Sequence, residues 1–213
     1  MKKIFIITIL FLFNTIWSIE ELNILKDKDG NVYKTVQIGS QVWMAENLNV
    51  KTKDGSWCYN NDSTNCEKYG RLYDWLTLMR LPEECDSLCF SKVTKKHRGI
   101  CPKGWHIPTK DEYKILFSQI GGENIAAKKL KSKETWNKNG HGTDEFNFSI
   151  LASGYRPGGK HFYSMGDIGT FWTASQSSSF YYVSSVYVNR LLDQIFLFER
   201  PRIQGHSVRC LMD

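Results

Sequence analysis

Six cysteines constrain this chain more than any other feature of its sequence. They are Cys58, Cys66, Cys85, Cys89, Cys101 and Cys210. An even number of cysteines in an exported protein favours disulfide bonds, which stabilise a fold chiefly by restricting the unfolded chain. We therefore expect a disulfide-bonded domain, provided that the N-terminus directs the chain out of the cytoplasm.

The N-terminus has the order of charged and apolar residues that is typical of a secretory signal peptide. Lys2 and Lys3 precede an apolar run over residues 4–13, and a short polar stretch ends at Ser18. We expect cleavage after Ser18, so that residues 1–18 are the signal peptide; an uncleaved anchor is the alternative. The apolar run falls short of the ~20 residues that span a bilayer, and no later segment approaches that length. The mature chain, residues 19–213, is thus predicted to be secreted or periplasmic, or to reach the cell surface through a partner, without a transmembrane span.

The charge of the chain argues against nucleic acid as a partner. The 28 Lys and Arg residues exceed the 22 Asp and Glu residues by six, and two of the lysines lie in the signal peptide. The remaining basic residues are interspersed with acidic ones, whereas nucleic-acid-binding proteins cluster theirs. Because no spacer rich in Gly, Ser or Pro divides the mature chain, a single globular domain is expected.

Two disulfides can be argued from the positions of the cysteines. Cys58 and Cys66 flank a polar, turn-forming run that would benefit from a local cross-link. A bond from Cys101 to Cys210 would join the last strand to the middle of the chain, which leaves Cys85 and Cys89 as a third pair. The alternative is a structural zinc site, since Cys85, Cys89, His97 and Cys101 have suitable ligand types and spacings.

The hydrophobic pattern predicts an early hairpin and helices, followed by strands. Residues 32–38 and 41–44 form the expected hairpin around Gly39-Ser40. Apolar residues recur at helical spacing from Gly70 until Pro82. Thr109 and Glu112 form a capping box for a helix that ends at Gly121-Gly122, and a shorter helix is expected over residues 125–131. Strands are expected over residues 171–174, 180–188, 194–198 and 207–211. This order indicates an α+β fold.

Seven short motifs follow one another along the chain in an order that is typical of a known family. They span residues 39–49, 58–62, 70–75, 100–108, 153–156, 169–175 and 207–210. Together they resemble the Fibrobacter succinogenes major paralogous domain family of exported bacterial proteins, over nearly all of the mature chain. That family is similar to C-type lectins and formylglycine-generating enzymes. The resemblance therefore implies one C-type-lectin-like α+β domain with neighbouring termini, and it brings no established activity.

The chain departs from the family in two ways. Many members are lipoproteins, whereas this chain has no cysteine at its cleavage region. Cys85 and Cys89 lie in a variable insertion over residues 81–99, so the family pattern does not support the third disulfide.

A cluster of aromatic and polar residues is the best candidate for a binding site. Its members are Phe180, Tyr181, Tyr182, Tyr187, Asn189 and Arg190. Flat rings beside amide and guanidinium donors suit a sugar or a protein surface, and we expect them to line an exposed strand edge. The resemblance puts the ligand surface of lectin-like folds in this region. The competing interpretation is ordinary β-structure in which alternate rings are buried.

We therefore predict a non-catalytic exported recognition module that binds a glycan or a surface protein and needs no cofactor. No metal is predicted, because the chain lacks the Glu-Pro-Asn and Trp-Asn-Asp triplets of calcium-dependent lectins. Two alternatives stay open. One is a hydrolase or another envelope enzyme, for which His106 or a reactive thiol is the candidate group. The other is a structural component of the cell envelope.

Overall fold

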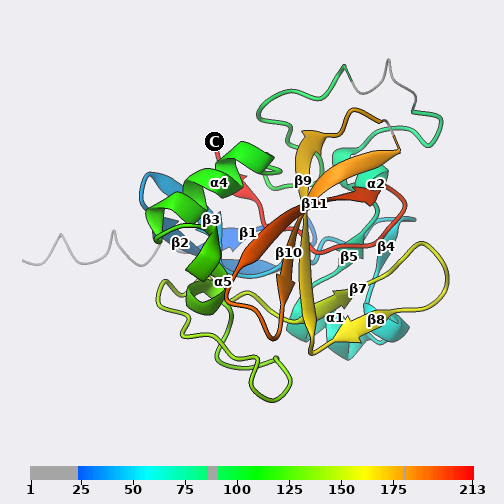
Figure 1. The fold of residues 1–213 in the computed structure, drawn as a ribbon. Coiled ribbons are helices and arrows are strands. Elements are labelled where there is room, and N and C mark those ends of the chain that lie inside the picture. The colour runs from blue at the N-terminus through cyan, green and yellow to red at the C-terminus, as the bar shows by residue number, and fades with distance from the viewer. Residues whose placement is uncertain (1–23, 86–90, 180) are drawn as a thin grey trace, which may run out of the picture.

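The computed structural model describes residues 24–85, 91–179 and 181–213, which form an α+β fold (Figure 1). The helices are α1 (Ser63–Tyr69), α2 (Trp75–Met79), α4 (Lys110–Gln119) and α5 (Glu123–Leu130), with a 3₁₀ turn, η2, over Tyr59–Asn61. The strands are β1 (Ile24–Lys26), β2 (Val32–Ile38), β3 (Gln41–Met44), β4 (Ser56–Trp57), β5 (Leu72–Tyr73), β6 (Trp105–His106), β7 (Ser153–Tyr155), β8 (Tyr163–Met165), β9 (Ile168–Gln176), β10 (Tyr182–Asn189), β11 (Ile195–Pro201) and β12 (Leu211–Met212). No helix among the described residues has the length and apolarity that a membrane crossing requires.

The first sheet has the strand order β1-β2-β3-β12-β6. Its centre is the hairpin expected from the sequence, in which Ile38 pairs with Gln41 around a two-residue turn. Gly39 adopts a φ of 59°, a conformation that costs glycine little because it has no Cβ. The hairpin prediction is confirmed.

Helix α4 begins with the capping box that the sequence predicts. The Thr109 hydroxyl accepts a hydrogen bond from the Glu112 amide, and the Glu112 carboxylate accepts one from the Thr109 amide at 2.7 Å. Behind the cap, the ring of Tyr113 packs 4.9 Å from that of Trp43, centroid to centroid. Helices α4 and α5 thereby cover a core that they share with the second sheet.

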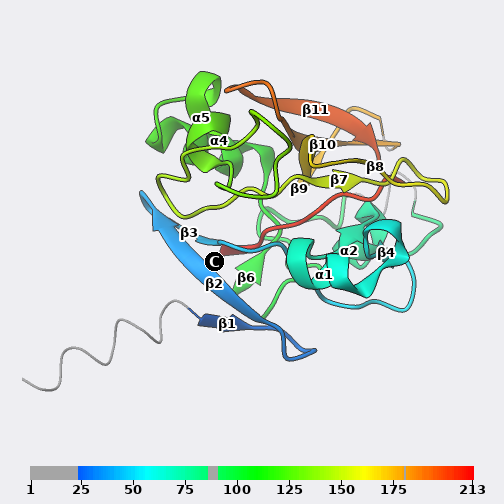
Figure 2. The same ribbon diagram turned by 90° about the horizontal axis from the view of Figure 1, so that it is seen from below.

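The second sheet has the order β11-β10-β9-β7-β8 (Figures 1 and 2). Alternate residues of its strands, including Val186, Val188 and Ile195, are buried in one core with α4 and α5. Because side chains alternate between the faces of a strand, Tyr187 and Phe196 belong to the opposite face. That opposite face is the part of the fold that positions the candidate site.

The C-terminal segment runs between the two sheets, as Figure 2 shows in red. On one side the Leu48 amide donates to the Val208 carbonyl at 2.9 Å. On the other side the Trp172 amide donates to the Ser207 carbonyl at 3.1 Å. The segment is therefore hydrogen-bonded to both halves of the molecule.

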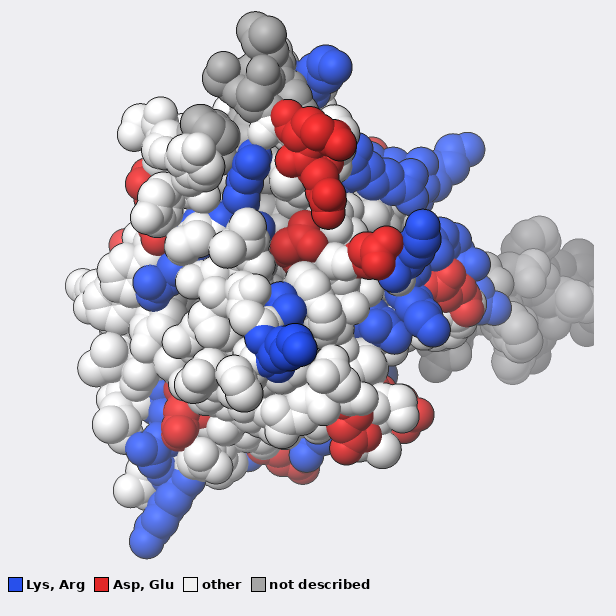
Figure 3. All heavy atoms as spheres, turned by 90° about the vertical axis from the view of Figure 1, so that its right-hand side faces the viewer, with Lys and Arg blue, Asp and Glu red and all other residues white. Residues whose placement is uncertain are grey.

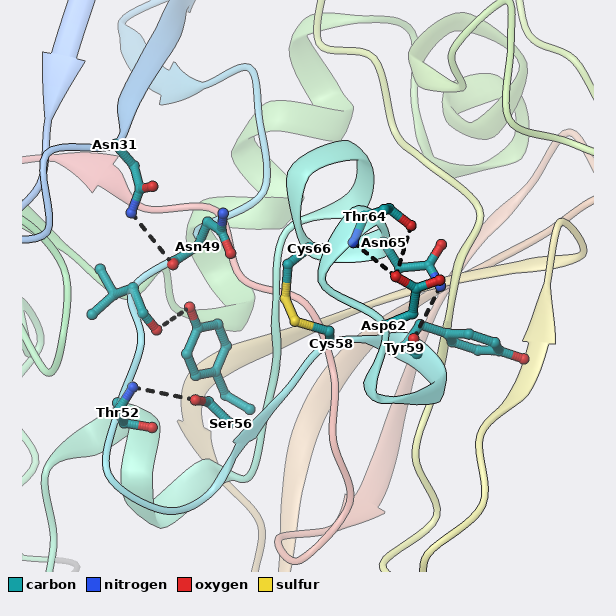
Figure 4. The surroundings of a disulfide bond; sticks show 12 residues. Asn31, Asn49, Thr52, Ser56, Cys58, Tyr59, Asp62, Thr64, Asn65 and Cys66 are labelled. Atoms are coloured by element: carbon teal, nitrogen blue, oxygen red, sulfur yellow. Dashed lines mark hydrogen bonds between the residues drawn. A yellow bond between two sulfur atoms is a disulfide. The ribbon is translucent and has the colours of Figure 1, made fainter.

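Two predicted disulfides are confirmed, Cys58–Cys66 and Cys101–Cys210. Figure 4 shows the first, which ties α1 to the turn before it. The second uses the sulfur of Cys101, so this atom is not available to the zinc site considered above. Cys85 is also disulfide-bonded, whereas its expected partner Cys89 lies outside the described residues.

The helix predicted from Gly70 is wrong over its first five residues. Residues Leu72–Tyr73 form β5, and α2 begins only at Trp75, after Asp74 accepts a hydrogen bond from the Thr77 amide at 2.8 Å. Gly70 has a φ of 71°, and an added Cβ there would lie 2.7 Å from Asn47. This tight, non-helical backbone interrupts the apolar pattern.

The strand predicted over residues 207–211 is also largely wrong, since only Leu211–Met212 is strand. Gly205, His206 and Ser207 instead form isolated bridges to three different partners. A segment that contacts both sheets in turn cannot extend either of them as a regular strand.

Candidate functional site

A pocket of about 220 Å³ opens on the outer face of the second sheet. Its lining comes from β7, β9, β10, β11 and the segment after β11. The residues are Tyr155, Pro157, Ile168, Thr170, Tyr187, Arg200, Gln204 and His206. This volume corresponds to about seven water molecules and lies below the roughly 300–1,000 Å³ of drug-sized sites, so it fits a single small ring.

The close approach of β7 to β8 positions Tyr155 in this pocket. Gly154 has a φ of 66°, and an added Cβ would lie 2.5 Å from the Tyr163 carbonyl oxygen. On the other side, Gly154 pairs with Gly169 of β9 in a parallel bridge. The two glycines bring Tyr155 beside the face of β9 that carries Thr170.

His206 forms the buried floor of the pocket. Its ring stacks on Trp172 at 4.1 Å between centroids, and Tyr155 lies 6.2 Å away on the same basis. Its Nε2 lies 3.1 Å from Oε1 of Gln204. With that oxygen as acceptor, Nε2 carries the proton and Nδ1 is left as an acceptor. Burial, with a further contribution from the charge of Arg200, lowers the pKa of His206 to about 3, so the ring is neutral at neutral pH.

Two polar atoms in the pocket have no hydrogen-bond partner among the described residues. They are Nδ1 of His206 and Oγ1 of Thr170. The two residues are only 1% and 2% exposed, so bulk water reaches them poorly. Because buried polar groups are nearly always hydrogen-bonded, these two atoms, which belong to residues that line the same pocket, require an explanation. A polar ligand in the pocket would supply the missing bonds.

Aromatic side chains continue outward from the pocket along β11. The rings of Phe196 and Phe198 are nearly parallel, at 4° and 5.6 Å between centroids, and Tyr187 lies 5.5 Å from Phe198. The guanidinium of Arg200 lies over two of these rings, 5.8 Å from Tyr187 and 5.1 Å from Phe198. The pocket therefore opens onto a surface of three neighbouring rings, two of them parallel and the third tilted, with one cation close to two of them.

The structure brings only part of the sequence-predicted site to this pocket. Tyr187 lines it, and Asn189 donates a hydrogen bond to the Tyr187 hydroxyl at 3.1 Å. Tyr181 and Tyr182 are 59% and 43% exposed at the start of β10 and do not line the pocket. Phe180 lies outside the described residues.

Arg190 is engaged elsewhere, because its guanidinium pairs with Asp167 at 2.8 Å and donates to the Lys138 carbonyl at 2.9 Å. The expectation of an exposed edge is also wrong, since β10 lies between β9 and β11. β10 pairs with β11 on one side and with β9 on the other, the latter with a register shift between Val183 and Ser185, so it presents no free edge to a ligand.

Sequence reasoning missed seven of the eight lining residues, among them the polar or aromatic side chains of Tyr155, Thr170, Arg200, Gln204 and His206. The motifs that carry the family resemblance could have revealed some of them. Tyr155 lies in the motif at residues 153–156 and Thr170 in the motif at 169–175, while His206 directly precedes the motif at 207–210. The three motifs meet at this pocket.

His106, the candidate of the enzyme alternative, is a buried link between two carboxylates. Its ring nitrogens lie 2.8 Å from Asp213 Oδ1 and 3.0 Å from Glu112 Oε1. Burial alone would lower the pKa of His106, but these hydrogen bonds outweigh it and hold the pKa above its ordinary value. The His106 ring links the start of α4 to residue 213, and both of its nitrogens are occupied.

Two wider hollows lie on the side of the first sheet. One, of about 1160 Å³, runs between β2, α1 and residues 132–151, and is lined by acidic and basic side chains in mixture. The other, of about 590 Å³, lies beside the Cys58–Cys66 disulfide, near Asn49 (Figure 4). Both are wider than the pocket on the second sheet and are lined by side chains of mixed charge.

Figure 3 shows the charged groups on the side of β4, β7 and β8. Acidic and basic groups are most frequent at the top and on the right, others lie along the lower rim, and separate basic groups interrupt the uncharged surface in the centre and on the left. Among the described residues, no group of three or more His, Cys, Asp or Glu side chains could hold a metal ion.

Comparison with known proteins identifies the family. No curated protein and no solved structure matches the chain, so the similarity to C-type lectins stays a prediction. The model of the Fibrobacter succinogenes major domain matches residues 36–212, which include both confirmed disulfides and the whole pocket. The chain belongs to the Fibrobacter succinogenes major domain family.

Proposed function

We propose that this chain is an exported, non-catalytic recognition module that binds a glycan through the pocket on the outer face of the second sheet. The observation that carries the proposal is that two buried polar atoms, Thr170 Oγ1 and His206 Nδ1, have no hydrogen-bond partner in the described part of the chain and belong to residues that line an aromatic-walled pocket. A sugar offers hydroxyl groups that both donate and accept, together with apolar C–H faces that pack on rings. It therefore satisfies both atoms while covering Tyr155 and Tyr187.

The rigidity of the site supports binding at low entropic cost. The floor residue His206 is fixed by Trp172 and Gln204, and the Ser207 amide donates to the Thr170 carbonyl at 3.1 Å. The Cys101–Cys210 disulfide secures the same C-terminal segment three residues beyond Ser207. Because these groups are ordered before a ligand arrives, little conformational freedom is lost on binding.

A glycan array tests the proposal, with the mature chain expressed in a periplasm so that its disulfides form. Thr170→Val keeps the shape of the side chain and removes its hydroxyl. We expect this variant to weaken binding of the retained glycans about tenfold or more, because a buried hydroxyl of the ligand loses its partner. Thr143→Val, at an exposed position away from the pocket, is the matched control and should bind as the wild type does.

A second pair of variants separates this pocket from the exposed tyrosines at the start of β10. Tyr187→Ala should weaken binding, whereas Tyr181→Ala with Tyr182→Ala should leave it unchanged. Loss of binding only in the double tyrosine variant would move the site to the start of β10. Retention of no glycan, together with capture of a defined surface protein, would replace the proposal with protein recognition.

A further inference from the structure

Arg200 is the only permanently charged side chain among the described residues that line the pocket, and no acidic side chain lines it. The ion pairs found among the described residues do not include Arg200. Its guanidinium lies instead over the rings of Tyr187 and Phe198. Arg190, ten residues earlier, shows the contrasting case of a guanidinium neutralised by a carboxylate.

The Arg200 guanidinium lies 5.1 and 5.8 Å from the ring centroids of Phe198 and Tyr187, and none of its N–H groups donates a hydrogen bond within the described part of the chain. A guanidinium presents a planar fork of donors whose geometry matches a carboxylate, to which it donates two parallel hydrogen bonds. Such a charge-assisted pair is stronger and more directional than a bond to a neutral hydroxyl. A negatively charged group with two oxygens would therefore complete this edge of the pocket.

Building on the proposed function, we infer that the sugar bound here is an acidic one, whose carboxylate pairs with Arg200 while its hydroxyl groups bind His206 and Thr170. Each of the three residues binds a different group of the sugar. Nδ1 of neutral His206 accepts from a sugar hydroxyl, the Thr170 hydroxyl donates or accepts, and Arg200 donates to the carboxylate. A pocket of about 220 Å³ restricts this recognition to one sugar unit. Neighbouring units of a longer chain would extend over Phe196 and Phe198.

Pairs of ligands that have the same sugar ring but differ in charge test whether the carboxylate contributes to binding. The probes are oligosaccharides of glucuronic, galacturonic and mannuronic acid, each compared with its own methyl ester, which keeps the ring and removes the charge. Binding is measured by calorimetry on the mature, disulfide-bonded chain. We expect at least one acid to bind about 10–100-fold more tightly than its ester, as for hydrogen bonds to charged groups, and to weaken as salt is added.

Arg200→Gln tests whether Arg200 is the residue that binds the carboxylate. This variant should reduce the preference for acid over ester to about twofold or less. Lys160→Gln removes one positive charge from the exposed loop between β7 and β8, outside the pocket lining, and should keep the full preference.

The outcomes distinguish the inference from the proposed function. Equal binding of acids and esters, or binding of neutral sugars alone, overturns the inference and leaves the glycan proposal standing. An acid preference that survives in Arg200→Gln also overturns it. Failure of every acidic and neutral sugar to bind removes both.

Discussion

Arg209 and His206 lie three residues apart on the same segment and are both fully buried, yet their surroundings differ. Each of the three guanidinium nitrogens of Arg209 donates a hydrogen bond, to Asn47 at 2.9 Å, to the Phe148 carbonyl, and to the Ser149 carbonyl at 2.7 Å. The guanidinium also lies 4.6 Å from the centroid of Phe148. Within residues 24–85, 91–179 and 181–213, the His206 ring makes one hydrogen bond, to Gln204, and its Nδ1 has no partner.

The contrast separates two uses of a buried polar group. Burial lowers the pKa of Arg209 to about 10, which still leaves the side chain charged at neutral pH, and its bonds join three separate parts of the chain. A fully bonded group of this kind holds the fold together. An unsatisfied buried group reduces stability in the free protein, and under the proposed function a bound ligand would supply its partner.

The first prediction concerns the disulfide beside Arg209 and has the largest expected effect. Replacing Cys101 and Cys210 with serine opens a loop of 109 residues and should lower the free energy of unfolding by about 4–5 kcal/mol. Replacing Cys58 and Cys66, only eight residues apart, should cost about 2–3 kcal/mol. Urea unfolding of both variants measures the difference, and equal losses would contradict the role given to the C-terminal segment.

The second prediction removes Arg209 itself. Arg209→Met fills a similar volume but leaves Asn47 and two buried carbonyl groups without a donor, so we expect a loss of about 3–5 kcal/mol. Arg209→Lys retains the charge without the planar fork and should recover only part of that loss. Unchanged stability of Arg209→Met in urea would show that the junction is not structural.

The third prediction uses pH to probe His206. Its folded pKa of about 3 lies below its unfolded value near 6.5, so between these limits the unfolded chain binds the extra proton. Stability should therefore fall as pH decreases from 6.5 to about 3, with a contribution of up to about 1.4 kcal/mol per pH unit from this group. His206→Phe keeps a ring on Trp172 and should remove this contribution from the unfolding curves.

His106 is the control, because its contribution to stability changes with pH in the opposite direction to that of His206. Because its pKa is raised, its contribution is present in full below pH 6.5 and is lost as the pH rises through the folded value. His106→Gln should change the unfolding free energy on the acidic side and flatten its decline above pH 6.5. If His206→Phe and His106→Gln altered the same pH range, the assignment of the two environments would be wrong.

The sequence signals that succeeded were local. Each of three confirmed features depends on residues within about ten positions of one another. They are the turn at Gly39-Ser40, the Thr109–Glu112 capping box and the Cys58–Cys66 loop. The Cys101–Cys210 bond is the exception, because it was predicted from the position of Cys210 near the end of the chain, where a cross-link joins the last strand to the middle.

The pocket could not be predicted in the same way, because each element contributes only one or two of its residues. Alternation within β10 separates Tyr187 from Val186 and Val188, but it does not reveal that β9 and β11 flank the strand. The approach of Tyr155 to His206 depends on a parallel bridge and on the path of an irregular segment. Neither leaves a periodic pattern in the sequence.

The last prediction has the smallest effect on stability and separates the two kinds of buried group most directly. Thr170→Val replaces a hydroxyl that has no partner among the described residues with a methyl group of similar size. Since no hydrogen bond is lost and an unsatisfied group is removed, the free energy of unfolding should stay within about 1 kcal/mol of the wild type or increase slightly. Ser207→Ala is the matched comparison, because the Ser207 hydroxyl is bonded to Ser153 at 2.9 Å and should cost about 1 kcal/mol or more when removed. A loss in Thr170→Val as large as that in Ser207→Ala would mean that Thr170 serves the fold, and the pocket would then need no ligand to explain it.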